Sequence, residues 1–423
     1  MLELLKDLLQ AAFRMVPWPT EPGLRRIGSP GRQSPVLLTA NYDLTVRRLV
    51  RALHGVDAWL LVAPARGINV WCAAAGGHLT THQVVTALKT SGIAEQVDHR
   101  ELIVPQLAAT GVEGLAVFRR SRWRVRFGPV RAEDVPAYLA GGGEKSESMR
   151  HVAFSLRDRI EMAAAWAAPI SIVLALGALL LRPTWALPLV GLCFGLAGAV
   201  FLVYDRIPRY GKPALGAAAT LTALAAVFLC GGGTAAHGAA LLAPAALLAI
   251  LTMDYAGSTP TEGSGHFDGQ DWKITLDVER CDGVFRCWEV CPEACFEKRE
   301  EERIVELAHD QRCVRCGACV VQCPQDALFF EDGAGRRIEP ETIRRFKLNL
   351  LGKRSVRPRA VPLREAGAPA RRRPRSGACG LADAWRAGPA TRATRRRRRR
   401  EAGAARSRLR APRPPAGAPV RNR

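Results

Sequence analysis

The chain carries the stretch Cys313-Val-Arg-Cys316-Gly-Ala-Cys319-Val-Val-Gln-Cys323-Pro324, which decides how its C-terminal part folds. The cysteines are spaced C-x2-C-x2-C-x3-C-P. In this spacing three neighbouring thiolates bind three irons of one [4Fe–4S] cube, and the cysteine before the proline serves a second cube. Chance or a disulfide framework rarely gives this spacing. The stretch therefore predicts an iron–sulfur site and a chain that carries electrons.

A second copy of the motif lies upstream and lacks one ligand. It reads Cys281-Asp-Gly-Val284-Phe-Arg-Cys287-Trp-Glu-Val-Cys291-Pro292, so Val284 stands where the second cysteine is expected. The pair of motifs resembles two-cluster bacterial ferredoxins, in which each motif gives its last cysteine to the other cube. Residues 270–350 are therefore expected to form an α+β, ferredoxin-like domain. Crossed ligation predicts two sets of thiolates. The complete set is Cys291, Cys313, Cys316 and Cys319. The incomplete set is Cys281, Cys287 and Cys323.

The incomplete set limits which cluster it can hold. Three thiolates suit a [3Fe–4S] cluster, or a [4Fe–4S] cluster whose fourth ligand is borrowed or is not a cysteine. Cys295 lies four residues past Cys291 and is the nearest possible donor. The alternative is that Cys295 is a small buried hydrophobic residue.

Positive charge is concentrated at the C-terminal end of this 423-residue chain, which is long enough for two or three domains. The formal net charge is +22, and residues 356–423 hold 21 Arg, no Lys and 3 acidic residues. Such a tail cannot bury a core, so it is expected to be disordered and solvated. The alternative is a polybasic segment that binds anionic lipid or nucleic acid. Nucleic acid is not expected, because Trp385 is the only aromatic residue of the tail.

Residues 160–254 are expected to form a membrane domain. Uncharged stretches of 20, 22 and 41 residues run over 162–181, 183–204 and 213–253. Each stretch is long enough to cross a bilayer, and the last can cross twice. Four helices are therefore expected, at about 163–181, 184–204, 214–230 and 235–252. Long core helices buried in protein are the alternative.

Basic residues predict how these helices are oriented. Arg157 and Arg159 precede the first span, and three more basic residues lie in the loop 205–212. Because cytoplasmic loops are rich in Lys and Arg, both soluble parts of this multi-pass protein are expected to face the cytoplasm. The acidic start of the chain does not read as a signal peptide. Contact with membrane lipid follows from this interpretation.

Residues 1–150 are expected to form an α/β domain. Strand-like runs begin at Val36, Ala58, Glu101 and Val125, and helical stretches cover 43–54, 81–91 and 132–139. This alternation predicts a sheet flanked by helices, of the Rossmann-like kind. In such folds ligands bind in the crevice at the carboxyl ends of the strands.

One loop of this domain combines a cysteine with small residues. It reads Gly67-Ile-Asn69-Val-Trp71-Cys72-Ala-Ala-Ala75-Gly-Gly-His78. The residues that follow Cys72 are small enough for a large, flat ligand to approach the backbone. The alternative is that Cys72 is an inert packing residue, as a lone cysteine among Ala and Val usually is.

The Asn69-Val-Trp71-Cys72-Ala-Ala segment resembles the cap helix of the mercury-methylating corrinoid proteins. It is also similar to the corrinoid iron–sulfur subunits of the CO dehydrogenase/acetyl-CoA synthase complex. The likeness covers about 35–140 and continues through Val97-Asp-His-Arg-Glu-Leu-Ile-Val-Pro-Gln and Phe127-Gly-Pro-Val-Arg-Ala-Glu-Asp-Val-Pro-Ala-Tyr-Leu. The order of a corrinoid domain followed by membrane helices matches the mercury-methylating branch. In that branch the ferredoxin is usually a separate protein. Here a ferredoxin-like segment follows the expected helices in the same chain.

The resemblance implies a methyltransferase that uses a cobalt corrinoid. Cys72 would face the cobalt, and Asn69 and Trp71 would shape the cap around it. The clusters would supply electrons to reduce cobalt, and Hg(II) is the acceptor expected in the mercury-methylating branch. A methyl-donor protein or methyl-folate enzyme and an electron donor are the implied partners.

The chain also departs from the family pattern. Ala75-Gly76 stands where the family has Gly-Lys, and the residues from His78 to Thr80 replace Thr-Phe-Gly. Together with Val284 these changes indicate a divergent paralogue. Two other interpretations remain open: a non-catalytic, membrane-tethered electron carrier, and a metal-handling membrane protein that uses Cys72 and Cys295 as soft ligands.

Overall fold

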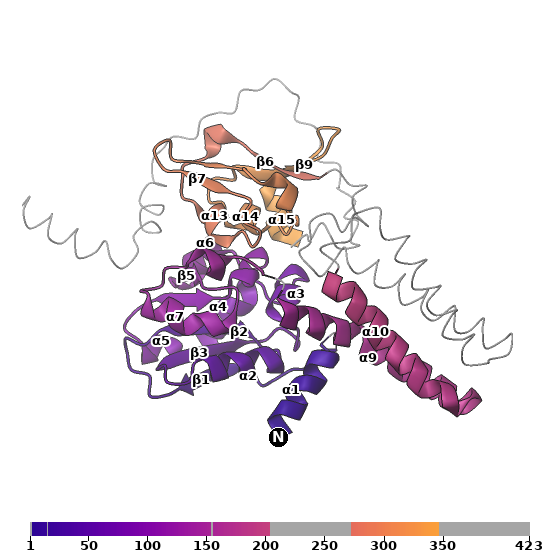
Figure 1. Cartoon of the computed structure of the whole chain (residues 1–423). Coiled ribbons are helices and arrows are strands. Elements are labelled where there is room, and N and C mark those ends of the chain that lie inside the picture. Colours follow the sequence, from indigo (N-terminus) through magenta and orange to yellow (C-terminus); the bar gives the residue numbers. More distant parts are fainter. Residues whose placement is uncertain (1, 15, 154, 204–271, 347–423) are drawn as a thin grey trace, which may run out of the picture. The chain divides into compact units, whose positions relative to one another are not determined.

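A computed structural model describes residues 2–14, 16–153, 155–203 and 272–346 (Figure 1). These ranges cover the α/β domain, two long helices and the cysteine-rich module. The spans expected at 214–230 and 235–252 lie outside the described residues, as does the basic tail 356–423.

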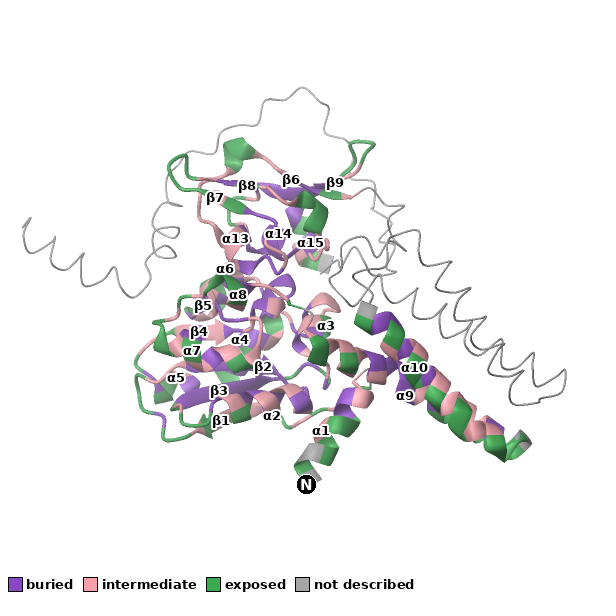
Figure 2. Ribbon diagram, viewed as in Figure 1, coloured by how far each residue is buried: buried purple, intermediate pink, exposed green. Residues whose placement is uncertain are grey.

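A five-stranded sheet forms the centre of the α/β domain. Its strands are β1 (Gly23–Ile27), β2 (Val36–Ala40), β3 (Ala58–Ala63), β4 (Glu101–Val104) and β5 (Arg124–Phe127), in the order β1-β3-β2-β4-β5. Strands β2 to β5 pair in parallel, and only β1 is antiparallel to its neighbour. All residues of β2 and β3 are buried, as expected for central strands covered on both faces (Figure 2).

Helices cover both faces of this sheet. Leu37 and Leu60 pack on one face with residues of α2 (Asp43–Ala52) and α7 (Val135–Ala140). Leu38 and Leu61 point to the other face, where they join residues of α4 (Thr81–Thr90) and α6 (Gly114–Ser121). The remaining elements of the domain are α1 (Leu2–Ala12), α3 (Val70–Ala75), α5 (Ile93–Gln96), η1 (Gln106–Thr110), η2 (Ala132–Asp134) and α8 (Glu147–Arg150).

The sequence predictions for this domain are confirmed for its four parallel strands and for the helices expected at 43–54, 81–91 and 132–139. They missed α1, β1 and α6. Strand β1 reads Gly-Leu-Arg-Arg-Ile and is only partly buried, because it is the edge strand of the sheet. It therefore lacks the apolar run that identifies a central strand.

The order of the strands creates a switch point between β2 and β4. From β2 the chain moves to β3 on one side, and then crosses back to β4 on the other side. Connections that leave β2 and β4 therefore diverge at the carboxyl ends of these two strands. Folds of this kind bind ligands in the crevice that results.

Two of the four expected spans lie in the described part of the chain. They are α9 (Leu156–Leu181) and α10 (Ala186–Val203), which are joined through η3 (Pro183–Trp185) and are long and apolar enough to cross a membrane. Helix α9 begins about two turns earlier than expected, because Ser155 and Asp158 form a capping box before the apolar stretch. The helices pack on each other through Trp166, Cys193 and Phe201.

The cysteine-rich module is small and mixes strands with helices, as expected. Its strands are β6 (Lys273–Leu276), β9 (Leu328–Glu331) and β10 (Arg337–Ile338), and the hairpin β7 (Glu297–Arg299) with β8 (Ile304–Glu306). Its helices are η5 (Val278–Arg280), α13 (Arg286–Val290), η6 (Asp310–Arg312), α14 (Ala318–Gln322) and α15 (Pro340–Phe346). Each cysteine motif runs into one short helix, α13 or α14.

Candidate functional site

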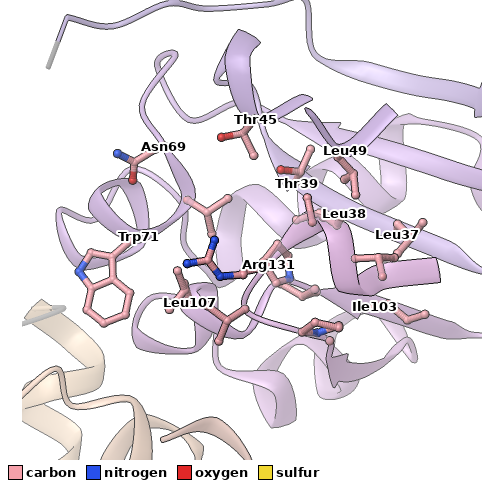
Figure 3. Close-up of a pocket in the computed structure, with 18 of the residues that line it drawn as sticks. Leu37, Leu38, Thr39, Thr45, Leu49, Asn69, Trp71, Ile103, Leu107 and Arg131 are labelled. Carbon is pink, nitrogen blue, oxygen red and sulfur yellow. The ribbon is translucent and has the colours of Figure 1, made fainter. Parts of the chain in front are cut away.

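A pocket of about 250 Å³ lies at the switch point of the sheet. It is lined by Leu37 to Thr39 of β2, by Ile103 to Pro105 at the end of β4, and by the residues after β5. Asn69, Val70 and Trp71 close it from helix α3. Figure 3 shows Asn69 and Trp71 at one end of the pocket and Leu37 and Ile103 at the other.

Two kinds of polar group reach the pocket wall. Thr39 is fully buried, and its hydroxyl has no hydrogen-bond partner within the described ranges. Buried polar groups are nearly always satisfied, so this hydroxyl indicates a ligand or water that binds there. Arg131 lies near the middle of the labelled residues (Figure 3), and it donates to the Ala153 carbonyl oxygen at 2.6 Å and pairs with Asp158.

The three residues predicted for the cap lie on or beside helix α3. The Asn69 side chain caps the helix by accepting a hydrogen bond from the Cys72 N–H at 3.0 Å. Asn69 and Trp71 line the pocket, whereas Cys72 is exposed and does not line it. Burial raises the pKa of the Tyr42 phenol, and the nearby Cys72 thiol adds to this rise. Cys72 therefore lies outside the pocket that its neighbours form.

The two cysteine motifs follow the same backbone course. Positive φ angles occur at matching positions, at Gly283 and Phe285 in the first motif and at Arg315 and Gly317 in the second. This match aligns Val284 with Cys316, in agreement with the spacing. A short helix follows the second of these positions in each motif. The module therefore has an internal pseudo-symmetry. Among the predicted ligand positions, only Val284 departs from it.

The described cysteines form no disulfide, and those of the cysteine-rich module gather in two groups. Burial raises the pKa of the Cys287 thiol, and the neighbouring thiols of Cys323 and Cys281 raise it further. Burial likewise raises the pKa of Cys316, with Cys291 and Cys313 as its neighbouring thiols. The structure thus brings together the members of each crossed set. Whether each set binds a cluster stays a prediction.

Cys295 lies with the complete set, not with the incomplete one. Hydrogen bonds from its thiol to Cys291 and Cys313 raise the pKa of Cys295. Its N–H donates to Cys291 Sγ at 3.3 Å, as the N–H of Ala327 does to Cys323 Sγ at 3.3 Å in the other motif. Cys295 is therefore the pseudo-symmetric counterpart of Ala327. Of the two alternatives for Cys295, this position does not favour a donor to the incomplete set, and its burial agrees with a small buried residue.

Within the part of the chain that the structure describes, no group of three His, Cys, Asp or Glu side chains is placed to hold a single metal ion. Cys72 lies exposed on α3 of the α/β domain, whereas Cys295 lies beside the cluster cysteines of the module. The metal-handling interpretation, which needs both as ligands, gains nothing from this arrangement.

Comparison with known proteins agrees with the division into an α/β domain and a cysteine module. Residues 12–139 match the family of the CO dehydrogenase/acetyl-CoA synthase delta subunit. Residues 309–329 match the 4Fe-4S binding domain. The first of these matches contains the whole sheet and all the residues that line the pocket. The second contains the complete cysteine motif.

The curated relatives are subunits of one complex. The acetyl-CoA decarbonylase/synthase complex subunit gamma of Archaeoglobus fulgidus is 36% identical over 125 residues, which are 29% of this chain and 26% of that protein. The subunit gamma of Methanopyrus kandleri is 36% identical over 129 residues, 30% of this chain and 28% of that protein. The chain thus spans about a quarter of the length of these relatives.

Sequence reasoning missed several residues of the site. Thr39 is the one polar residue in the apolar run of β2, and this was a signal that could have found it. Arg131 follows β5 by four residues, at the edge where ligands of such sheets bind. Gln322 stands where the first motif has Val290, and a polar residue at a helix position that is apolar in the other motif is also informative.

Proposed function

We propose that the chain is a membrane-anchored corrinoid iron–sulfur protein that transfers a methyl group from a cobalt corrinoid to an acceptor. The observation that carries this proposal is the pocket at the switch point, which lies within the region that matches the CO dehydrogenase/acetyl-CoA synthase delta subunit family. The cysteine module in the same chain supplies a source of electrons for cobalt.

The pocket has features that suit part of a corrinoid. The free hydroxyl of Thr39 and the guanidinium of Arg131 offer hydrogen bonds to polar groups of a ligand. Its volume of about 250 Å³ is below the usual range for drug-sized ligands, so it can take only part of so large a cofactor. When bound, the corrinoid supplies the cobalt that carries the methyl group.

Helix α3 presents the proposed cobalt ligand. Asn69 fixes the first turn of this helix, and Trp71 and Val70 form the pocket wall beside it. Cys72 is exposed, so a ligand that extends out of the pocket can meet its thiol. A thiolate is a soft donor, and an axial thiolate pushes electron density towards a metal.

The anchoring part of the proposal rests on α9 and α10. Val173, Leu180 and Leu187 are exposed to 70%, 88% and 81%, and apolar surface of this kind is rare on soluble monomers. Helices with such surfaces are stable when lipid covers them. Localisation in the cytoplasmic membrane, with both soluble parts facing the cytoplasm, completes the proposal.

The visible spectrum of anaerobically purified protein tests the function. We expect corrinoid bands in the wild type, a shift of these bands in Cys72→Ala, and weaker corrinoid retention in Thr39→Val. Cys193→Ala is the matched control, because Cys193 is buried between α9 and α10. Identical spectra for wild type and Cys72→Ala would exclude Cys72 as an axial ligand.

A second candidate function is electron transfer without methyl transfer. It is favoured by the position of Cys72 outside the pocket. Under this alternative no corrinoid copurifies with the wild type, while iron and sulfide are present. The same preparation therefore separates the two functions.

Hg(II) is the acceptor that we propose for the methyl group. The proposal rests on the resemblance of the Cys72 segment to the mercury-methylating branch and on the attraction of this soft ion to thiolates. Cells that make the chain should form methylmercury from Hg(II), and cells that make Cys72→Ala should not. Corrinoid binding without methylmercury would point to a different acceptor.

A further inference from the structure

Two buried glutamines join the cysteine module to the α/β domain. Gln322, the last residue of α14, donates from Nε2 to the carbonyl oxygens of Ala109 and Val112, each at 2.7 Å. Its Oε1 accepts from the Gly114 N–H at 3.2 Å. The side-chain amide of Gln322 is thus fully occupied by one turn of the α/β domain, at η1 and the residues after it.

Gln106 makes the corresponding contact from the other side. Its Nε2 donates to the Arg150 carbonyl oxygen at 2.7 Å and lies 3.4 Å from the Cys291 carbonyl oxygen. Its Oε1 accepts from Lys145 Nζ at 2.7 Å, and Lys145 also donates to the Glu289 carbonyl oxygen at 3.0 Å. Burial lowers the pKa of Lys145 to about 8.

Residues of the segment 145–152 extend this contact. Arg150 donates to the Trp288 carbonyl oxygen at 3.0 Å, and its guanidinium lies 3.5 Å from the centre of the Trp288 ring. The Val152 N–H donates to the Pro292 carbonyl oxygen at 3.0 Å. These bonds surround the end of α13, where Cys291 lies.

Apolar packing identifies which half of the module meets the α/β domain. Val290 and Ala318 belong to the same buried cluster as the core of the sheet, and Cys316 packs against that cluster. Cys281, Cys287 and Cys323 pack only within the module's own core, among the residues described. The complete cysteine set therefore contributes a residue to the interface, and the incomplete set contributes none.

We propose that the module is docked on the α/β domain rather than tethered to it, with Gln106 and Gln322 as positioning residues, and that the complete cysteine set is the side from which electrons leave the module. The assignment of the electron exit rests on the proposed function, whereas the docking does not. One electron leaves the reduced cluster, which is oxidised by one unit, and enters an acceptor held by the α/β domain. The incomplete set is then left to face an external one-electron donor.

Contacts inside the α/β domain connect the docked module with helix α3 at the candidate site. Helix η1 packs against α3, and Gly111 after it lies so close to Ala74 that an added Cβ would be 2.7 Å from the Ala74 carbonyl oxygen. Ala74 belongs to the helix that bears Cys72. The cysteine module therefore contacts η1, and η1 contacts α3.

Hydrogen exchange in the full-length protein tests the docking. In Gln322→Ala the Gly114 amide loses its acceptor, so exchange of peptides from 106–115 should become about tenfold faster, with unchanged iron and sulfide content. Gln106→Ala should have a similar effect on peptides from 145–152. Gln325→Ala and Gln33→Ala are matched controls, because both side chains make exposed hydrogen bonds within their own parts of the chain.

Each outcome of this test decides the docking. Unchanged exchange in both glutamine variants would overturn it. If Gln322→Ala loses iron, Gln106→Ala decides alone, because Gln106 is not part of the cysteine module. Acceleration in the interface variants and not in the controls would establish a docked module.

A second measurement tests the electron exit. Clusters reduced with dithionite are mixed with aquacobalamin as the acceptor probe, and their reoxidation is followed by absorbance. Gln322→Ala should reoxidise about tenfold more slowly and yet be reduced by dithionite at the wild-type rate. An unchanged reoxidation rate would overturn the exit assignment. If aquacobalamin does not reoxidise the wild type at all, the proposed function fails, while hydrogen exchange still decides the docking.

Discussion

At the scale of single residues, Val284 is the reason that one cysteine set has three members and the other has four. Its backbone follows the course that places Cys316 in the other motif. The side chain is partly exposed, so a smaller thiol can replace it without leaving a buried cavity. Val284→Cys should therefore convert the incomplete set into a second four-cysteine set. Iron analysis and EPR of the oxidised protein should show the three-iron or labile site replaced by a second [4Fe–4S] cluster.

The wild type serves as the reference for this change. If it already holds two equally stable [4Fe–4S] clusters, Val284 is not a missing ligand and the crossed assignment is wrong. Val314→Cys, a cysteine added at a non-ligand position of the other motif, should leave the cluster content as it is.

Cys295 allows the opposite test. Its pseudo-symmetric counterpart is Ala327, and the backbone around both residues makes the same hydrogen bond. Cys295→Ala should therefore keep both clusters, at a cost of about 1 kcal/mol or less for the lost buried thiol. Iron and sulfide content is the measurement, and Cys291→Ala, which removes a predicted ligand, is the comparison. A loss of iron in Cys295→Ala comparable to that in Cys291→Ala would make Cys295 a ligand.

The spacing of the cysteines was enough to predict which thiols lie together in each set, because cluster chemistry fixes short distances along the chain. That these thiols are ligands stays a prediction. The spacing was not enough to place Cys295, whose nearest sulfurs include Cys313, eighteen positions away. The same limit applies to Thr39 and Arg131, which meet at the pocket only because β2 and β5 belong to one sheet. Neighbours brought together by the fold leave little trace in local sequence.

At the scale of elements, the first turns of α9 are held on the α/β domain by ion pairs. Glu161 accepts two hydrogen bonds from Arg48, at 2.6 and 3.2 Å, and a third from Arg157 at 3.1 Å. Its side chain is only 13% exposed, which strengthens these contacts relative to surface pairs. The apolar helix α9 therefore starts from a charged contact with the α/β domain. Hydropathy alone identified the apolar stretch but not this charged beginning.

Glu161→Gln should weaken the contact between the first turns of α9 and the α/β domain. Removing the charge leaves Arg48 without its acidic partner in a partly buried site, which should cost about 2 kcal/mol. Hydrogen exchange over residues 156–162 should accelerate accordingly. Glu133→Gln is the control, because Glu133 pairs with Arg157 at 3.8 Å in an exposed position and should change exchange little. Equal effects of the two changes would show that Glu161 does not anchor the helix.

At the scale of the whole molecule, contacts between soluble parts restrict how the chain can cross a membrane. Gln322 and Gln106 bond the cysteine module to the α/β domain, so the two must lie on the same side of any bilayer. The number of crossings between residues 156 and 272 must then be even. Helices α9 and α10 are the two candidate crossings among the described residues, and the segments expected at 214–230 and 235–252 would add two more. The basic loops of the sequence led to the same arrangement by an independent argument.

Reporter fusions test this conclusion. A reporter that is active only in the cytoplasm should be active after Met149 and after Asp271, and inactive after Arg182, between α9 and α10. The fusion after Met149 is the positive control, because it contains no apolar span. Activity at all three positions would mean that α9 and α10 do not cross the membrane. Inactivity after Asp271 alongside Arg182 would require an odd number of crossings, which the hydrogen bonds between the two soluble parts do not allow, so the docking itself would be refuted.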